Sequence, residues 1–337
     1  MKNTTIKDVA SHAGLSITTV SRYINNNYPV SAAAREKIEE AIQTLGYKPN
    51  LAARSLKSNN SGMIGLVVAD IANRFFMKIA KGLEEVVWEH GYQTIFASSD
   101  GEAEKERRIL SMFEERRVDA LVIASSDTKP DYLNAFAQDG TPVVAIARWV
   151  EGLHADAVLE DNRKAAYQLL NFLLERGHRD IAFQNVNMRL TTGRERFEGA
   201  LQAMREHNME PAAEWISPGG FTREDAVAWA RTVFADDAKY PTAVFCANNM
   251  MTEGTLIVLK DIGLAVPEDV SLVSFGEVTM RELIEPPIVS VRQNPYELGN
   301  AAGKIILRRL QGDSSPYKQE RYPVEIVEGR SVKKLKL

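Results

Sequence analysis

The segment from residue 16 to residue 22 carries side chains suited to hydrogen bonding with a nucleic acid. As a helix, this segment has an outer face without acidic residues, and that face offers Ser16, Thr18, Thr19, Ser21 and Arg22. Short hydroxyl groups suit contacts with phosphate oxygens, and an arginine is long enough to reach a guanine edge in the major groove of DNA. A small helical bundle without a partner is the alternative, but the composition of this face favours DNA binding.

Residues for catalysis or metal binding are scattered along the chain. The first apolar segment is followed by Ala-Asp-Ile-Ala-Asn at 69–73 rather than by a Gly-x-Gly-x-x-Gly loop, and the sequence has neither a P-loop lysine motif nor a Gly-x-Ser-x-Gly motif. The single cysteine, Cys246, excludes an internal disulfide and a cysteine-based metal cluster. No metal-ligand spacing connects the five histidines, which are His12, His90, His154, His178 and His207. We therefore expect a binding protein without catalytic residues, metal or cofactor.

Three short helices are predicted to position the polar face. Each follows a hydroxyl residue that can cap it, and they are predicted over 6–12, 17–25 and 32–45. Gly14 allows a tight turn between the first two helices, because glycine tolerates a positive φ. Two helices joined by a glycine turn and braced by a third are typical of a DNA-reading helix-turn-helix.

The next segment, residues 51–57, is only one or two helical turns long and is too short to be stable alone. We expect a hinge helix that orders only on DNA, against the same helix of a second copy. Leu56 is then a candidate wedge for a base step in the minor groove, and the small Ala52 and Ala53 allow a close approach. A plain linker, with Leu56 packed on the rest of the protein, is the alternative.

The charge distribution separates the N-terminal region from the rest of the chain. Residues 1–60 hold eight basic and four acidic side chains, and the remaining 277 residues hold 33 basic and 41 acidic ones. A basic N-terminal region on an acidic body fits a DNA-binding module attached to a sensor. The apolar runs reach only the length of a strand and no signal peptide is recognisable, so we expect a cytoplasmic protein without a membrane segment.

From residue 62 onward, short apolar strands alternate with longer helical segments. This repetition is typical of a parallel sheet with helices on both faces. The strands occur in two series, at 63–68, 93–97, 120–123 and 143–146, and then at 180–183, 243–246 and 271–275. Two similar halves indicate two doubly wound subdomains with a cleft between them.

Short motifs occur in a characteristic order along the chain. In the N-terminal region they are TIKDVA at 5–10, AG at 13–14, TVSR at 19–22, LGYKPN at 45–50 and ARSL at 53–56. In the body they are DIANRFF at 70–76, RVDAL at 117–121, EDN at 160–162, RGHRDI at 176–181, VPEDVS at 266–271 and PP at 286–287. With these motifs essentially the whole chain resembles the LacI/GalR family of bacterial repressors.

The resemblance implies roles for individual residues of the N-terminal region. The base-reading residues would be Ile17, Thr18 and Arg22. The phosphate anchors would be Thr5, Ser16, Thr19 and Ser21, and the hinge would contribute Ala53 and the minor-groove lever Leu56. A family member of this kind binds a near-palindromic operator as a homodimer.

The resemblance also implies that the body is similar to periplasmic sugar-binding proteins, with a ligand between two lobes. Three segments would cross between the lobes, near Asp161, Val291 and Arg321. The pocket positions of the family fall on Phe76, Arg148, Asp161, Thr192, Arg196, Phe221, Asn248, Asn249 and Gly276. An aromatic face can stack on a ring, while amides and hydroxyls satisfy the hydroxyls of a ligand.

Two departures from the family pattern concern the charge of the ligand. Many relatives have an aspartate where this chain has Asn249 and another where it has Gly276, whereas Arg148 and Arg196 provide positive charge. A site with arginines and fewer acids suits an anion, such as a sugar acid or a sugar phosphate, better than a neutral sugar. Neighbouring carboxylates can also pair with either arginine, so a neutral sugar stays the alternative.

The expected fold is a small all-α helix-turn-helix head followed by an α/β body of two doubly wound subdomains, similar to a periplasmic binding protein. The divisions are 1–47 for the helix-turn-helix, 48–61 for the hinge helix and linker, 62–161 with 292–321 for the N-terminal subdomain, and 162–291 with 322–337 for the C-terminal subdomain. The expected function is a sequence-specific transcriptional repressor controlled by a small metabolite in the cleft. A ligand-binding protein of periplasmic type without DNA function is the alternative.

Overall fold

The computed structural model describes residues 4–24, 29–47, 60–138, 140–220, 222–236 and 239–335. The chain divides into two compact units, Met1–Ser61 and Gly62–Leu337. Of the hinge predicted over 48–61, only residues 60 and 61 are described, so Ala53 and Leu56 lie outside the described residues. Phe221, predicted for the pocket, lies outside them as well.

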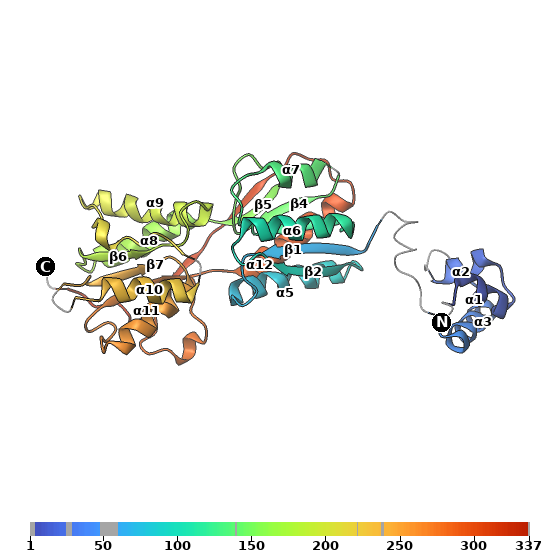
Figure 1. Ribbon diagram of the computed structural model, residues 1–337, viewed down its shortest axis with the longest axis horizontal. Helices are drawn as coiled ribbons and strands as arrows, with labels where there is room; N and C mark the ends of the chain where they lie inside the picture. The colour runs from blue at the N-terminus through green and yellow to red at the C-terminus, as the bar shows by residue number, and fades with distance from the viewer. Residues whose placement is uncertain are drawn as a thin grey trace. The chain divides into compact units, whose positions relative to one another are not determined.

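The first unit consists of α1 (Ile6–Ala13), α2 (Ile17–Ile24) and α3 (Ala32–Leu45), as the sequence predicts (Figure 1). Val9, Val20 and Ile38 are fully buried where the three helices meet. Gly14 ends α1 with φ of 66°, a conformation that costs other residues free energy. The Ser31 hydroxyl accepts a hydrogen bond from the Ala34 amide at 3.3 Å and so begins α3. Local capping thus sets the ends of these helices.

The second unit contains two sheets, each with its own helices, which we call the N-lobe and the C-lobe. In the described residues, the N-lobe sheet has the strand order β10-β5-β4-β3-β1-β2, and its registered pairs are all parallel. These strands are β1 (Met63–Val68), β2 (Gln93–Ser98), β3 (Ala120–Ile123), β4 (Val143–Ile146), β5 (Asp156–Glu160) and β10 (Gln319–Tyr322).

Helices cover both faces of the N-lobe sheet (Figure 1). One face packs on α5 (Arg74–Trp88) and α12 (Pro295–Leu310), and the other on α6 (Ala103–Glu115) and α7 (Asp131–Gln138). Leu66 and Val68 of β1 belong to the first core and Val67 to the second, because successive strand residues point to opposite faces. A continuous apolar strand is therefore buried on both sides, as in other parallel sheets.

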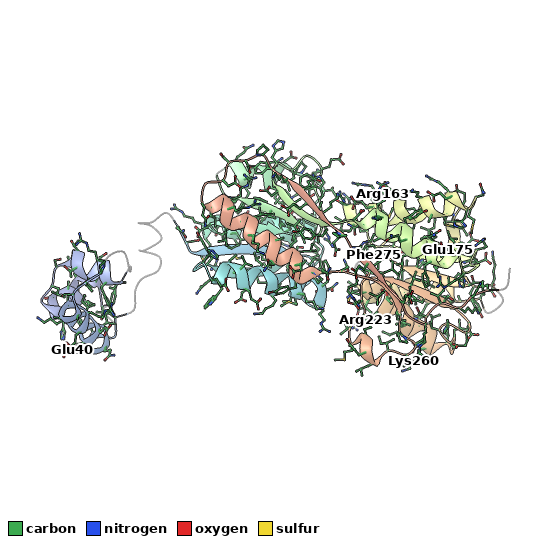
Figure 2. All side chains as sticks on the ribbon, turned by 180° about the vertical axis from the view of Figure 1, so that it is seen from behind. Glu40, Arg163, Glu175, Arg223, Lys260 and Phe275 are labelled. Atoms are coloured by element: carbon green, nitrogen blue, oxygen red, sulfur yellow. The ribbon has the colours of Figure 1, made fainter. Side chains whose placement is uncertain are left out.

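The C-lobe sheet has the order β11-β9-β8-β7-β6 in the described residues, with β11 antiparallel to β9. Its strands are β6 (Ile181–Gln184), β7 (Ala243–Cys246), β8 (Ser271–Phe275), β9 (Val289–Arg292) and β11 (Glu325–Val327). Figure 1 shows α8 (Asn162–Leu174) and α9 (Thr191–Glu206) on one face, with α10 (Arg223–Val233) and α11 (Asn249–Asp261) on the other. Figure 2 shows charged side chains, among them Arg163 and Lys260, on the outside, whereas Phe275 is fully buried.

Three described segments connect the two lobes. They lie between β5 and α8 at Asp161, between β9 and α12 at residues 293–294, and between β10 and β11 at residues 323–324. Arg292 is still in the C-lobe sheet and Tyr322 still in the N-lobe sheet. These segments are the only covalent links between the lobes in the described residues, so they form the hinge of the body.

Several elements were not predicted from the sequence. These are β5, β9, β10, β11 and α12. The apolar pattern of α12 is interrupted by Gly299 and Gly303, which made it hard to recognise as a helix. A Cβ atom added at Gly299 would lie inside the contact radius of the Ile79 carbonyl oxygen. Gly299 is therefore needed for close packing of α12 on α5.

Candidate functional site

The outer face of α2 is set by the residues that α2 buries. Val20 is fully buried, and the Tyr23 hydroxyl donates a hydrogen bond of 2.6 Å to Glu39 on α3. Ile17, Thr18 and Arg22 are consequently exposed, and Ile17 retains 46% of its accessible surface. An exposed aliphatic side chain can contact a thymine methyl group, a hydroxyl can hydrogen-bond to a base edge, and a guanidinium can reach a guanine edge.

Two of the predicted phosphate anchors, Thr5 and Ser16, also cap α1 and α2. The Ser16 oxygen accepts a hydrogen bond from the Thr19 amide at 3.1 Å and lies 2.8 Å from the Thr19 hydroxyl. The Thr5 amide and hydroxyl both donate to Asp8 Oδ2 at 2.7 Å. Thr5 and Ser16 are exposed, and Thr19 and Ser21 are half-buried. As residues that bind DNA, all four stay predictions.

A cavity of about 300 Å³ lies between the lobes of the body. Six of the nine predicted pocket residues line it, and these are Phe76, Arg148, Thr192, Arg196, Asn248 and Asn249. Sequence reasoning missed Asp70, Asn73, Phe75, Asp100, Gly101, Val186, Thr222 and Gln293, which also line it. Asp70, Asp100, Val186 and Gln293 follow the ends of β1, β2, β6 and β9 closely, and the carboxyl ends of parallel strands are where such folds bind ligands. A position just after a strand was therefore the sequence feature that could have identified these four residues.

Two predicted pocket residues do not line the cavity. The Asp161 carboxylate accepts a hydrogen bond of 3.2 Å from the Lys164 amide and so caps α8. Gly276 follows β8 with φ of 101°, and a Cβ atom there would lie 2.7 Å from Gln293 Oε1. Gly276 therefore leaves space for Gln293, which does line the cavity.

Arg196 is a buried cation of the C-lobe side, in the second turn of α9. Its Nε donates to Asn162 Oδ1 at 2.9 Å and its Nη1 to the Ala247 carbonyl oxygen at 2.6 Å. The guanidinium also stacks 3.7 Å from the centre of the Phe275 ring. Burial lowers the pKa of Arg196 to about 10, with repulsion from Arg148 adding to the effect and Glu160 opposing it. Arg196 is thus still charged at neutral pH.

Arg148 is the matching buried cation of the N-lobe side. It follows Ala147, whose φ of 61° is unusual for a residue with a side chain. Its Nη1 donates to the Ser125 carbonyl oxygen at 3.3 Å and lies 3.5 Å from the Ser126 hydroxyl. Burial lowers the pKa of Arg148 to about 10, and the charge of Glu106 opposes this change. Arg148 therefore also carries its charge at neutral pH.

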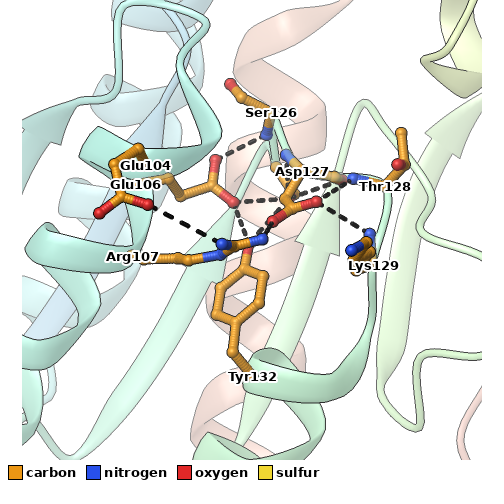
Figure 3. A network of polar contacts seen from close by, with 9 residues as sticks. Glu104, Glu106, Arg107, Ser126, Asp127, Thr128, Lys129 and Tyr132 are labelled. Atoms are coloured by element: carbon orange, nitrogen blue, oxygen red, sulfur yellow. Dashed lines mark hydrogen bonds and ion pairs between the residues drawn. The ribbon is translucent and has the colours of Figure 1, made fainter.

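A polar network behind Arg148 fixes the loop after β3 (Figure 3). The fully buried Glu106 carboxylate accepts hydrogen bonds of 2.6 Å from the Ser125 hydroxyl and the Ser126 amide, and a third from the Tyr132 hydroxyl. Burial and the neighbouring Glu106 raise the pKa of Tyr132 above its usual value, so this hydroxyl stays a donor. The network holds in place the two serines that contact Arg148.

Direct contacts between the lobes lie next to the cavity. The side-chain amides of Asn73 and Asn249 are within 3.3 Å of each other, and the Thr191 hydroxyl donates to the Trp149 carbonyl oxygen. At the hinge, Arg321 forms an ion pair with Glu195 at 2.9 Å. Since Glu195 precedes Arg196 in α9, the cavity wall and the hinge share one helical turn.

Glu160 lies at the hinge with its carboxylate buried. Burial raises the pKa of Glu160, and the positive charge of Arg196 opposes this shift. Oε2 accepts a hydrogen bond from Gln293 Nε2, whereas Oε1 has no hydrogen-bond partner among the described residues. This bond connects the first crossing segment with the second.

The described residues offer neither a metal-binding cluster nor a membrane-spanning helix. They contain no group of three or more His, Cys, Asp or Glu side chains arranged to hold a metal ion. In the same residues no helix has both the length and the apolar surface needed to cross a membrane. The α2 face and the interlobe cavity are therefore the two sites to explain.

Comparison with known proteins connects these two features. Residues 5–50 match the family described as bacterial regulatory proteins, lacI family, and residues 170–332 match a periplasmic binding protein-like domain. The HTH-type transcriptional repressor PurR of Vibrio cholerae serotype O1 is 34% identical over 332 residues, which cover 98% of each chain.

Solved structures share the fold. A LacI family transcriptional regulator from Enterococcus faecium, with bound ribose, is 27% identical, with a TM-score of 0.71 over 81% of this chain and all of that one. The lac repressor dimer bound to operator and an anti-inducer is 23% identical, with a TM-score of 0.85 over 98% of this chain and all of that one. The similarity to the repressor from Vibrio cholerae extends over both units, and the chain belongs to the lacI family of bacterial regulatory proteins.

Proposed function

We propose that the protein is a DNA-binding transcriptional repressor whose affinity for its operator is controlled by a small molecule bound between the lobes. One observation carries this function: the same chain has an exposed polar face on α2 and an interlobe cavity lined by polar and aromatic side chains. The full-length similarity to a transcriptional repressor supports it. A bound ribose in the Enterococcus faecium regulator supports a small polar effector.

The protein acts as a homodimer on a near-palindromic operator, because paired helix-turn-helix units read symmetric half-sites. Trp88 on α5 and Leu283 in the body are 62% and 77% exposed, and a second copy can cover such apolar side chains. The effector changes the angle between the lobes and thereby the affinity for DNA, a coupling of typically about 1–3 kcal/mol. Such a regulator has no catalytic step and works in the bacterial cytoplasm, where its DNA is.

A mobility-shift experiment tests this function. Labelled DNA from upstream of the protein's own coding region is titrated with the full chain and with residues 62–337, which hold the cores of both lobes. We expect retardation by the full chain and none by residues 62–337. Equal retardation by both proteins, or none by either on any upstream fragment, contradicts the proposal.

Replacement of Arg22 by alanine tests base readout. We expect a loss of roughly 1–3 kcal/mol in operator binding and relaxed discrimination at one symmetric pair of base positions, since a bidentate contact with guanine is lost. Arg35→Ala is the matched control, because it removes one positive charge from an exposed position of the same unit. Fluorescence anisotropy on operator and on random DNA gives both affinities. An equal loss on random DNA would make Arg22 a phosphate contact.

A further inference from the structure

We propose that the effector is a polyhydroxylated anion, a polyol with a carboxylate or phosphate group, and that Arg148 and Arg196 bind its charged group from opposite lobes. This inference rests on the proposed function of the cavity and specifies the class of its ligand. Both arginines line the cavity and are more than nine-tenths buried. One comes from the loop after β4 and the other from α9, so a ligand that contacts both joins the two lobes.

The charges of the cavity lining are sorted by depth. The two lining arginines are buried, whereas of the two lining carboxylates Asp70 is half-buried and Asp100 is exposed. Asp100 is also engaged by Lys105 and by the Ser98 hydroxyl at 2.6 Å. The cations of the lining are therefore buried, whereas its carboxylates lie where solvent screens them. The buried carboxylates that act on the two arginines, Glu106 and Glu160, do not line the cavity.

The two buried cations that line the cavity repel each other. Besides burial, Arg148 contributes to the lowered pKa of Arg196, and Arg196 donates hydrogen bonds to the uncharged oxygens of Asn162 and Ala247. Burying a charge costs free energy unless it is paired with an opposite charge. An anionic group between the two guanidiniums offsets this repulsion with charge-assisted hydrogen bonds.

Helix ends add to the positive potential. The first turns of α5, α9 and α11 all contribute residues to the lining, namely Phe75, Thr192 and Asn249. The N-terminus of a helix carries a partial positive charge. Asn73 and Asn248 cap α5 and α11, whereas Leu190 before α9 has no side-chain oxygen for capping. The amides that begin α9 therefore favour an anion beside Arg196.

The rest of the lining suits hydroxyl groups. Thr192, Thr222, Asn73, Asn249 and Gln293 provide hydroxyls and amides that both donate and accept hydrogen bonds. Phe76 provides an aromatic face, as carbohydrate sites commonly do, and Asp70 can accept hydroxyl protons at the outer end. A polyol with its charged group directed inward satisfies both ends of the cavity.

A ligand panel on the full chain tests this class. The panel contains glucose with gluconate, glucuronate and glucose 6-phosphate, and ribose with ribose 5-phosphate. We expect at least one anion to raise Tm at a concentration at which its neutral partner has no effect, since a ligand that binds only the folded state stabilises it. Hits among the carboxylates identify a sugar acid and hits among the phosphates a sugar phosphate. Shifts by neutral sugars only, or no shift by any anion, contradict the inference.

Arg148→Gln tests the clamp without disturbing the bonds that Arg196 makes to the protein. Calorimetry is expected to show a loss of roughly 30-fold or more in affinity for the anion found in the panel, because a desolvated charged contact is lost. A neutral hydrogen bond would account for only roughly tenfold or less. Arg194→Gln is the matched control, since Arg194 is exposed on the same helix as Arg196 and does not line the cavity. An unchanged affinity of the Arg148 variant contradicts the clamp.

Asn249→Asp adds a negative charge to the cavity while keeping an oxygen that can accept from Asn73 Nδ2. Asn249→Ala removes the same amide without adding charge, so it measures the cost of losing the amide, to which the aspartate variant adds a negative charge. We expect the aspartate variant to bind the anion more weakly than the alanine variant. Tighter binding by the aspartate variant contradicts the inference. If the full chain shifts its upstream DNA but no anion binds, the proposed ligand class is wrong and the repressor function stands. If an anion binds but no upstream DNA is shifted, the ligand class stands and the repressor function is wrong.

Discussion

Arg309→Ala is expected to lower the free energy of unfolding of the body by about 3–5 kcal/mol, the range for breaking a buried ion pair. Arg309 on α12 holds Asp156 of β5 through two bonds, Nε to Oδ2 at 2.7 Å and Nη2 to Oδ1 at 3.1 Å. Only 10% of the arginine side chain and 5% of the aspartate side chain are exposed. The alanine variant leaves a buried carboxylate that still accepts a hydrogen bond of 3.0 Å from the Lys318 amide.

Loss of the ion pair between Arg309 and Asp156 also affects the hinge between the two lobes of the body. Arg309 Nη1 donates to the carbonyl oxygens of Asp313 and Ser315, which belong to the turn that leads into β10. Since β10 pairs with β5 and continues into the third crossing segment, we expect weaker effector binding together with lower stability.

Urea unfolding followed by tryptophan fluorescence measures the effect of Arg309→Ala. Arg308→Ala is the control, because Arg308 is the exposed neighbour on the same helix and forms no ion pair among the described residues. Arg309→Lys should fall between the wild type and the alanine variant, since lysine keeps the charge but loses the bidentate geometry. If Arg309→Ala unfolds at the same urea concentration as Arg308→Ala, the pair does not stabilise the body.

Gly299→Ala is expected to destabilise the N-lobe by about 1–3 kcal/mol, as overpacking commonly does, or to prevent its folding. The added Cβ would meet the Ile79 carbonyl oxygen, and it would lie 2.9 Å from the Leu83 backbone nitrogen. Backbone atoms of a helix cannot rotate away as side chains do. The substitution therefore separates α5 from α12, and α5 carries Phe75 and Phe76 into the cavity.

Gly303→Ala is the matched control for Gly299→Ala. It lies one turn further along α12 and gains the same intrinsic helix propensity, about 1 kcal/mol. Its Cβ would lie 3.0 Å from Cβ and Cγ1 of Val86, a contact that a small shift of the two helices can relieve, rather than against backbone atoms. We expect thermal unfolding to show a much smaller effect for Gly303→Ala. Equal Tm values for the two variants would mean that backbone contact does not set the spacing of these helices.

The N-terminal helices could be predicted because their determinants are local. The hydroxyl of Ser31 and the left-handed glycines Gly14 and Gly46 lie within a few residues of the helix ends that they set. The burial of Val20 follows from helical spacing within α2, and with it the exposure of Arg22. Most strands of the body were recognisable for a similar reason, since a continuous apolar run is what a parallel sheet buries on both faces.

The cavity could be predicted only in part. Similarity to a known family indicated six of its lining residues, but Asp70, Asp100 and Gln293 come from the ends of three different strands and were missed. Asp161 carries the same kind of side chain as Asp70, yet it caps α8 instead of lining the cavity. The sequence did not distinguish these two carboxylates, because which one faces the ligand depends on the orientation of each strand end.

By itself, the sequence determined the helix-turn-helix, the alternation of strands and helices, and the residue types available for a ligand. Only the tertiary structure decided that α12 packs on α5, that β5 is buried with its aspartate, and that two arginines from different lobes share one cavity. Asp156 and its partner Arg309 are 153 residues apart in the sequence. Short-range sequence patterns cannot reveal a pair at this separation. Contacts within a helix or turn follow from bonded geometry, whereas contacts between separately formed lobes depend on how their surfaces pack.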